Sequence, residues 1–157
     1  MNFADAFKAA GAPLGTPRNQ WSALEPDGKF IAVTVWAHEY DDSRCRGSTP
    51  ILGRPHPKAQ RYFYNTPEYL KEWANNREAA DRAAPDSAYG WKLLKEHHQR
   101  AFAEKLPVRI VVIQAKGSAD GSSRSNVKDA RYRSDWEAEL NYFDPVTGAY
   151  EYAIWLV

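Results

Sequence analysis

The sequence Gln114-Ala115-Lys116 is the best candidate for metal-dependent chemistry, because it follows a strongly hydrophobic run. Metal-dependent nucleases use an oxygen ligand beside a lysine at a strand end, where the metal and the cation activate water. That arrangement also needs an acidic residue one strand earlier. Residues 106–113 contain none, and Glu104 belongs to a predicted helix. A lysine whose stem lies along the strand end is the alternative interpretation.

The four histidines do not form a metal-binding pattern. His97 and His98 are adjacent, so on a helix they point about 100° apart and cannot easily share an ion. His98 lies on an apolar stripe and is interpreted as a hydrogen-bonded core residue. His38 and His56 lie in polar segments near Asp41 and Asp42, but no spacing fixes a site. We therefore expect no metal and no cofactor.

Cys45 is the single cysteine, and it stands between two arginines that would lower its thiol pKa. A small hydrolase using His38 and Cys45 is one alternative function, although no family-specific spacing supports it. One cysteine excludes an internal disulfide and favours an intracellular compartment. Residues 1–10 lack the pattern of a signal peptide, and no apolar run could cross a bilayer. We expect a soluble, cytoplasmic protein.

Two segments concentrate positive charge, although the formal net charge of the 157 residues is only +1. Residues 44–61 and 116–133 each contain five basic residues. They are Arg44, Arg46, Arg54, Lys58 and Arg61, and Lys116, Arg124, Lys128, Arg131 and Arg133. Cations that contact phosphates, next to aromatic residues that stack on bases, are typical of nucleic-acid binding. This interpretation requires the two segments to meet in space.

Aromatic residues make up 13% of the chain and provide candidates for a base pocket. We expect its walls to come from Trp21, Trp36 and Tyr40, with His38 beside them. Tyr62-Phe63-Tyr64 is predicted to be a short strand with one face buried and the other available.

The elements that would position these residues can be predicted from periodicity. Phe3, Phe7 and Ala10 share one face of a short helix, and Asp27-Gly28 predicts the turn of a hairpin over residues 20–36. Thr66 and Pro67 begin a helix that continues to about residue 83. A second helix covers residues 88–105, with an apolar stripe that includes Leu94, His98, Ala101 and Phe102.

The C-terminal half is predicted to supply most of the sheet. Residues 108–115 form a central strand buried on both faces, and residues 136–142 alternate as a half-exposed strand does. Residues 144–148 are predicted to form a turn, and residues 150–157 the strand that runs back beside residues 136–142. Together the pattern predicts one α+β domain over residues 1–157, with a curved, mostly antiparallel sheet of five or six strands, or a partly open barrel, and about three helices.

Several short motifs resemble a known family. They are Phe3 to Ala10, Pro17-Arg18-Asn19-Gln20-Trp21-Ser22-Ala23, Asp27-Gly28, Val33-Thr34-Val35-Trp36 and Ala88-Tyr89-Gly90-Trp91-Lys92. This arrangement is similar to PUA-like and SET-and-RING-associated-like domains found beside HNH nucleases in restriction proteins that read modified DNA. The sequence departs from that pattern at Ala23-Leu24, where the family carries a second Trp-Gly. The resemblance implies a bacterial restriction-modification context, a PUA-like barrel, and a flipped modified base held in an aromatic pocket.

The leading hypothesis from the sequence is a non-enzymatic nucleic-acid-binding module, with DNA favoured as the partner. Two other classes stay open. One is an enzyme, either a metal-dependent nuclease using Lys116 or the small hydrolase described above. The other is a protein-interaction accessory subunit, with a nuclease partner or a second copy of the chain bound to exposed aromatic residues.

Overall fold

A computed structural model describes residues 2–15, 21–36, 47–65, 86–115 and 127–157. Two helices and seven strands are found there, in the order α1 (Phe3–Ala9), β1 (Ser22–Leu24), β2 (Ile31–Trp36), β3 (Arg61–Asn65), α4 (Asp86–Glu104), β4 (Pro107–Ala115), β5 (Val127–Tyr132), β6 (Trp136–Phe143) and β7 (Tyr150–Leu156). The helix predicted over residues 67–83 lies outside the described ranges. The expected α+β class is confirmed.

One open sheet contains all seven strands, in the order β1-β2-β4-β6-β7-β3, with β5 also paired to β4. Every pair of neighbours is antiparallel except β2 and β4, which run parallel. The mostly antiparallel sheet is confirmed, but the count of five or six strands was too low. The strand that was missed is β5, because its sequence, Val-Lys-Asp-Ala-Arg-Tyr, has the composition of a charged loop.

The predicted hairpin is present. Ser22–Leu24 pairs with Ile31–Val33, and the turn contains Gly28 at a φ of 72°. A positive φ is strained for residues with a Cβ, which explains the Asp-Gly sequence at this turn.

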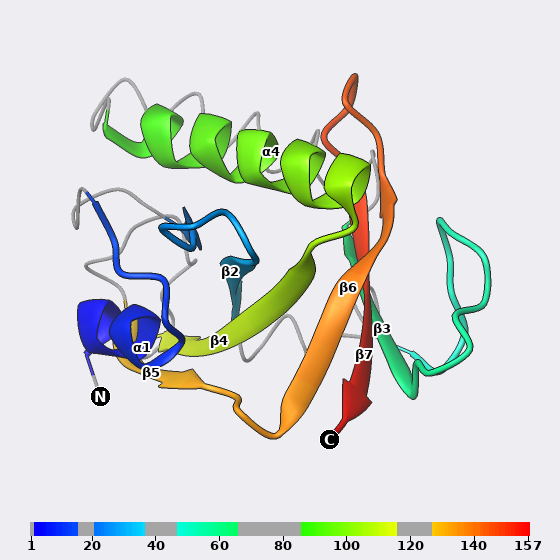
Figure 1. The fold of residues 1–157 in the computed structure, drawn as a ribbon, viewed down its shortest axis with the longest axis horizontal. Helices are drawn as coiled ribbons and strands as arrows, with labels where there is room; N and C mark the ends of the chain where they lie inside the picture. Colours follow the sequence, from blue (N-terminus) through cyan, green and yellow to red (C-terminus); the bar gives the residue numbers. More distant parts are fainter. Residues whose placement is uncertain (1, 16–20, 37–46, 66–85, 116–126) are drawn as a thin grey trace.

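The two helices lie on opposite faces of the sheet, and β4 is buried between them (Figure 1). Ile110 faces the larger core, which also contains Ala101 of α4. Val111 and Ile113 face the smaller core, where Phe3 and Phe7 of α1 pack. Neighbouring residues of a strand point to opposite faces, so this division is the expected one for a strand buried on both sides. The central position predicted for β4 is confirmed.

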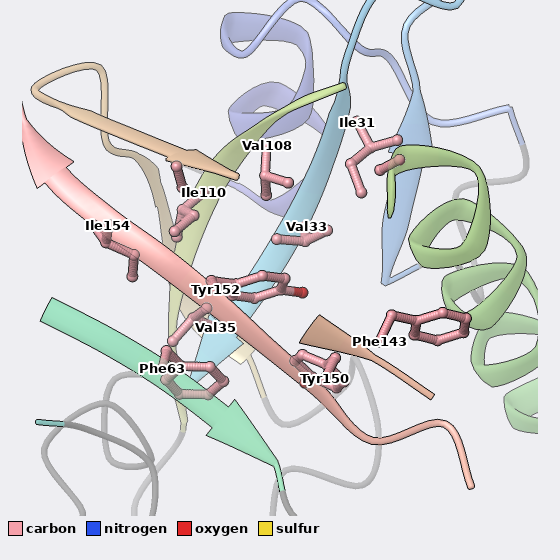
Figure 2. Close-up of a cluster of buried hydrophobic side chains, with 12 residues drawn as sticks. Ile31, Val33, Val35, Phe63, Val108, Ile110, Phe143, Tyr150, Tyr152 and Ile154 are labelled. Atoms are coloured by element: carbon pink, nitrogen blue, oxygen red, sulfur yellow. The ribbon is translucent and has the colours of Figure 1, made fainter. Parts of the chain in front are cut away.

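The larger core joins strands that are far apart in the sequence. Figure 2 shows Ile31, Val33 and Val35 of β2 together with Tyr152 of β7 and Phe63 of β3. His98 of α4 is also buried in this region, 1% exposed, and its Nε2 lies 2.6 Å from the Tyr152 hydroxyl. The predicted core histidine is confirmed. Phe102, which was placed on the same stripe, is instead 43% exposed, because it lies one residue beyond the buried Ala101.

All three aromatic residues of β3 are buried, which corrects the expectation that one face would be available. Phe63 packs in the larger core, whereas Tyr62 and Tyr64 pack in a third cluster with Leu52 and Trp155. Residues 47–60, which precede the strand, therefore cover the face that we expected to be open.

A bend between β5 and β6 opens the sheet at the edge of β4. Both strands pair with the same edge of β4, β5 at Val111 and beyond, and β6 only at Pro107 and Val108. Residues 133–135 make the turn between them, with the Trp136 amide donating to the Arg133 carbonyl at 3.1 Å. Because β6 turns away to pair with β7, the ladder between β4 and β6 opens beyond Val108 (Figure 1).

Candidate binding surface

The structure places only part of the predicted base pocket. Trp21 is 8% exposed and packs edge-on against Phe3, with ring centroids 5.8 Å apart. It is a core residue, because the indole closes the smaller core beneath α1, and this corrects its expected role as a pocket wall. The side chain of Trp36, and all of His38 and Tyr40, lie outside the described residues.

The structure also describes only some of the ten basic residues predicted to contact nucleic acid. Arg44, Arg46, Lys116, Arg124 and the side chain of Lys128 lie outside the described residues, as do Cys45, Asp41 and Asp42. The side chains of Arg54, Lys58, Arg61 and Arg131 are exposed, and that of Arg133 is half-buried.

The two basic segments meet at Arg61 and Arg133. These side chains line one hollow of about 350 Å³ with Gln60, Trp136, Ile154, Trp155 and Leu156, which we call the arginine hollow. Arg61 belongs to β3 and Arg133 to the turn before β6, and β7 lies between them in the sheet. Antiparallel pairing of β7 with both β3 and β6 therefore brings residues 72 positions apart to one site.

Arg133 is held in place by two neighbours. Its Nε and Nη2 donate to the two carboxylate oxygens of Asp135 at 2.8 and 2.6 Å, and its guanidinium lies 3.9 Å from the ring centre of Trp136. The hydrogen bonds from Arg133, together with the charges of Arg133 and Arg131, lower the pKa of Asp135 to about 2. The arginine is thus oriented before any ligand arrives, in a planar form suited to oxyanions.

Gln60 adds a neutral donor to the arginine hollow. Its Oε1 accepts a hydrogen bond from the Leu156 amide at 3.2 Å. Its amide nitrogen donates to no residue in the described part of the chain and can donate to a ligand. Two guanidinium groups and an amide give this hollow the chemistry of an anion site.

A second hollow, of about 400 Å³, lies where β4 and β6 separate. Its lining includes the aromatic residues Tyr132, Trp136 and Trp155 and the charged residues Arg109, Glu137 and Glu139, and we call it the glutamate hollow. Trp136 and Trp155 line both hollows. The register sets Glu137 opposite Trp155, so these two side chains share the sheet face away from Trp136.

Trp155 is fixed by three polar neighbours. Its Nε1 donates to Glu137 Oε2 at 3.0 Å, the imidazole of His56 stacks on it with centroids 5.1 Å apart, and Lys58 Nζ lies 5.7 Å from its ring centre. His56 Nε2 in turn bonds Glu139 Oε1. Since His56 Nδ1 accepts from the Lys58 amide at 3.1 Å, Nε2 carries the proton in this arrangement.

The segment that carries His56 and Lys58 is anchored by a buried carboxylate. Glu151 is fully buried, and its oxygens accept the backbone N–H groups of Ile51, Leu52 and Gly53 at 2.7, 2.9 and 3.0 Å. Asn141 Nδ2 donates a fourth bond at 2.7 Å. Buried polar groups need hydrogen-bond partners, and these four donors satisfy the Glu151 carboxylate, which holds the segment on β7.

A serine–histidine pair elsewhere has the composition, but not the accessibility, of a catalytic site. Ser22 Oγ lies 2.6 Å from His97 Nδ1 between β1 and α4. Ser22 is fully buried and His97 is 9% exposed. Burial lowers the pKa of His97 to about 4 and that of His98 to about 3. The pair therefore joins helix to sheet.

Neither Trp136 nor Trp155 was among the residues that the sequence led us to expect in a binding site. The signal that could have found them is a tryptophan at the beginning of one strand and another near the end of the next. Antiparallel pairing of the two strands brings both indoles to one end of the sheet. The register that brings the ends together is not visible in either strand alone.

Comparison with known proteins gives no relative: no protein family, curated protein or solved structure matches this chain. Within the described ranges, no three histidine, cysteine or acidic side chains are grouped as a metal site requires. Neither described helix has the length and apolar character needed to span a bilayer.

Proposed function

We propose that this chain is a nucleic-acid-binding module whose phosphate contacts are Arg61 and Arg133. The observation that carries the proposal is the arginine hollow, in which cations from both basic segments lie beside two indoles. Guanidinium groups form paired hydrogen bonds to phosphate oxygens, and neighbouring indoles offer faces and edges to an unstacked base. Arg131 and Lys58 add positive charge near the arginine hollow.

The proposal favours an unpaired or extruded base over an intact duplex. Stacking on an aromatic ring contributes about 1–3 kcal/mol per base, which is comparable with the few kcal/mol needed to extrude one. In this proposal the indoles of Trp136 and Trp155 form aromatic walls of the site. We also propose that the chain is related to PUA-like domains that read modified DNA. The open, mostly antiparallel sheet supports this relation.

The test is a binding titration with a fluorescent single-stranded oligonucleotide at several salt concentrations. We expect the affinity to fall steeply with salt, and Arg61→Ala and Arg133→Ala each to reduce the log–log slope by about 0.7. Arg100→Ala is the matched control, because Arg100, like Arg133, is paired with a nearby acid, Glu104 at 2.8 Å, but belongs to α4. Salt-independent binding, or equal slopes for all three variants, would contradict the proposal.

A second titration addresses base modification. Duplexes with and without a methylated cytosine are compared at two salt concentrations. Tighter binding of the methylated duplex, lost in Trp155→Ala, would extend the proposal to modified bases. Equal affinity for both duplexes would limit it to nucleic acid in general.

A further inference from the structure

We infer that the glutamate hollow binds a guanine base by the edge that carries two adjacent N–H donors. The inference rests on the proposed function and deepens it by naming the base. It starts from the cavity between β4 and β6, whose volume of about 400 Å³ suits a planar heterocycle. Its aromatic lining consists of Tyr132, Trp136 and Trp155.

Each of the two carboxylates in this hollow has one oxygen engaged and one open. Glu137 Oε2 accepts the Trp155 indole N–H, and Glu139 Oε1 bonds the His56 imidazole. No described residue donates to the other oxygen of either carboxylate. Both glutamates point to the same face, because they are two residues apart on β6. The two carboxylates with open acceptors thus lie on one face of β6, and each is oriented by a ring partner.

An ionised carboxylate only accepts hydrogen bonds, so the edge it recognises must donate. Guanine offers N1–H and the N2 amino group side by side. Adenine and cytosine place an acceptor next to their amino group, and thymine flanks its single N–H with two carbonyls. An acceptor facing a carboxylate leaves both without a donor, which is costly in a partly enclosed site. Guanine is therefore the base that these oxygens favour.

One cation, Arg109, lies in the lining of the glutamate hollow, and the arginine hollow is next to it. The Arg109 guanidinium is fixed by the Ala10 carbonyl at 2.7 Å and by the Phe30 ring at 3.7 Å. The two hollows share Trp136 and Trp155. A base in the glutamate hollow would thus lie next to the site that we propose for phosphate.

The experiment compares short oligothymidylates that carry one central guanine, hypoxanthine, adenine or cytosine. We expect the guanine strand to bind about ten-fold more tightly than the adenine or cytosine strand. Hypoxanthine keeps N1–H but lacks the amino group, so its strand should be intermediate. Glu137→Gln and Glu139→Gln should each reduce the preference for guanine to about two-fold or less, because an amide also donates.

The measured quantity is the ratio of affinities, since removing a negative charge raises the affinity for every strand. Glu104→Gln, on α4, is the matched control and should keep the full preference. Equal binding of all four strands with a normal salt slope would overturn the inference and leave the proposed function intact. Absence of binding to any strand would overturn both. Saturable binding of choline without a preference for guanine would also overturn the inference, and would identify an aromatic cage for cations.

Discussion

Glu151 is the residue on which the candidate surface most depends, although it contacts no ligand in our proposal. A fully buried carboxylate is rare in proteins unless donors surround it, and this one has four. Gly53 completes the arrangement, because a Cβ there would lie 2.5 Å from the Asn141 carbonyl oxygen. The segment with His56 and Lys58 is thereby held against β7.

Replacing Glu151 by glutamine should therefore loosen this segment without unfolding the sheet. The amide places an N–H group against backbone N–H groups, and we expect the free energy of unfolding to fall by about 2 kcal/mol. Urea denaturation measures the change, and Glu104→Gln, an exposed control, should stay within about 0.5 kcal/mol. Hydrogen exchange at the Ile51, Leu52 and Gly53 amides should become faster. Unchanged exchange would show that the carboxylate does not anchor the segment.

Single residues were predictable where one local pattern determines their place. His98 follows Leu94 by four residues on an amphipathic helix, which indicated its burial. Trp21 was misplaced because an aromatic residue at the end of a hairpin serves a core and a pocket equally well. Its burial depends on α1, which covers it with Phe3. Side chains at the meeting point of two elements cannot be assigned from either element alone.

At the scale of elements, α1 should be essential to the sheet face that it covers. Phe7 is fully buried among Ala10, Val111 and other residues of the smaller core. Phe7→Ala leaves a cavity there, and we expect a loss of about 3–5 kcal/mol in the free energy of unfolding. Lys8→Ala changes an exposed residue of the same helix and serves as the control. A loss below about 1 kcal/mol for Phe7→Ala would mean that α1 is dispensable.

Elements with strong local signals were predicted, and those created by pairing were not. The Asp-Gly turn, the hydrophobic run of β4 and the alternation of β6 each identify their structure in the sequence. The apolar alternation of β5 is limited to Ala130 and Tyr132, which pack in the smaller core, and the edge of β4 supplies its hydrogen bonds. The parallel pairing of β2 with β4 joins strands separated by more than 70 residues, so no local pattern reports it. The arginine hollow depends on such long-range pairing.

For the whole molecule, the two buried histidines predict how stability depends on pH. The pKa of His98 is about 3 and that of His97 about 4 in the folded protein, because burial disfavours the charged imidazole. In the unfolded chain both pKa values return to about 6.5. Between these limits the unfolded state binds more protons, so stability is full above about pH 6.5 and falls as the pH decreases.

We expect urea denaturation to show this loss between pH 6.5 and pH 5, the range above the ordinary pKa values of carboxylates. Each histidine that is neutral when folded and charged when unfolded contributes at most about 1.4 kcal/mol per pH unit. The variant His98→Gln has no titrating group at that position and should have a shallower dependence, and adding His97→Asn should make it shallower still. Measurements of the unchanged protein from pH 7.5 to 8.5, where both imidazoles are neutral in either state, provide the baseline. An equally steep loss in the double variant would show that other groups control acid stability, and that α4 is not joined to the sheet by neutral histidines.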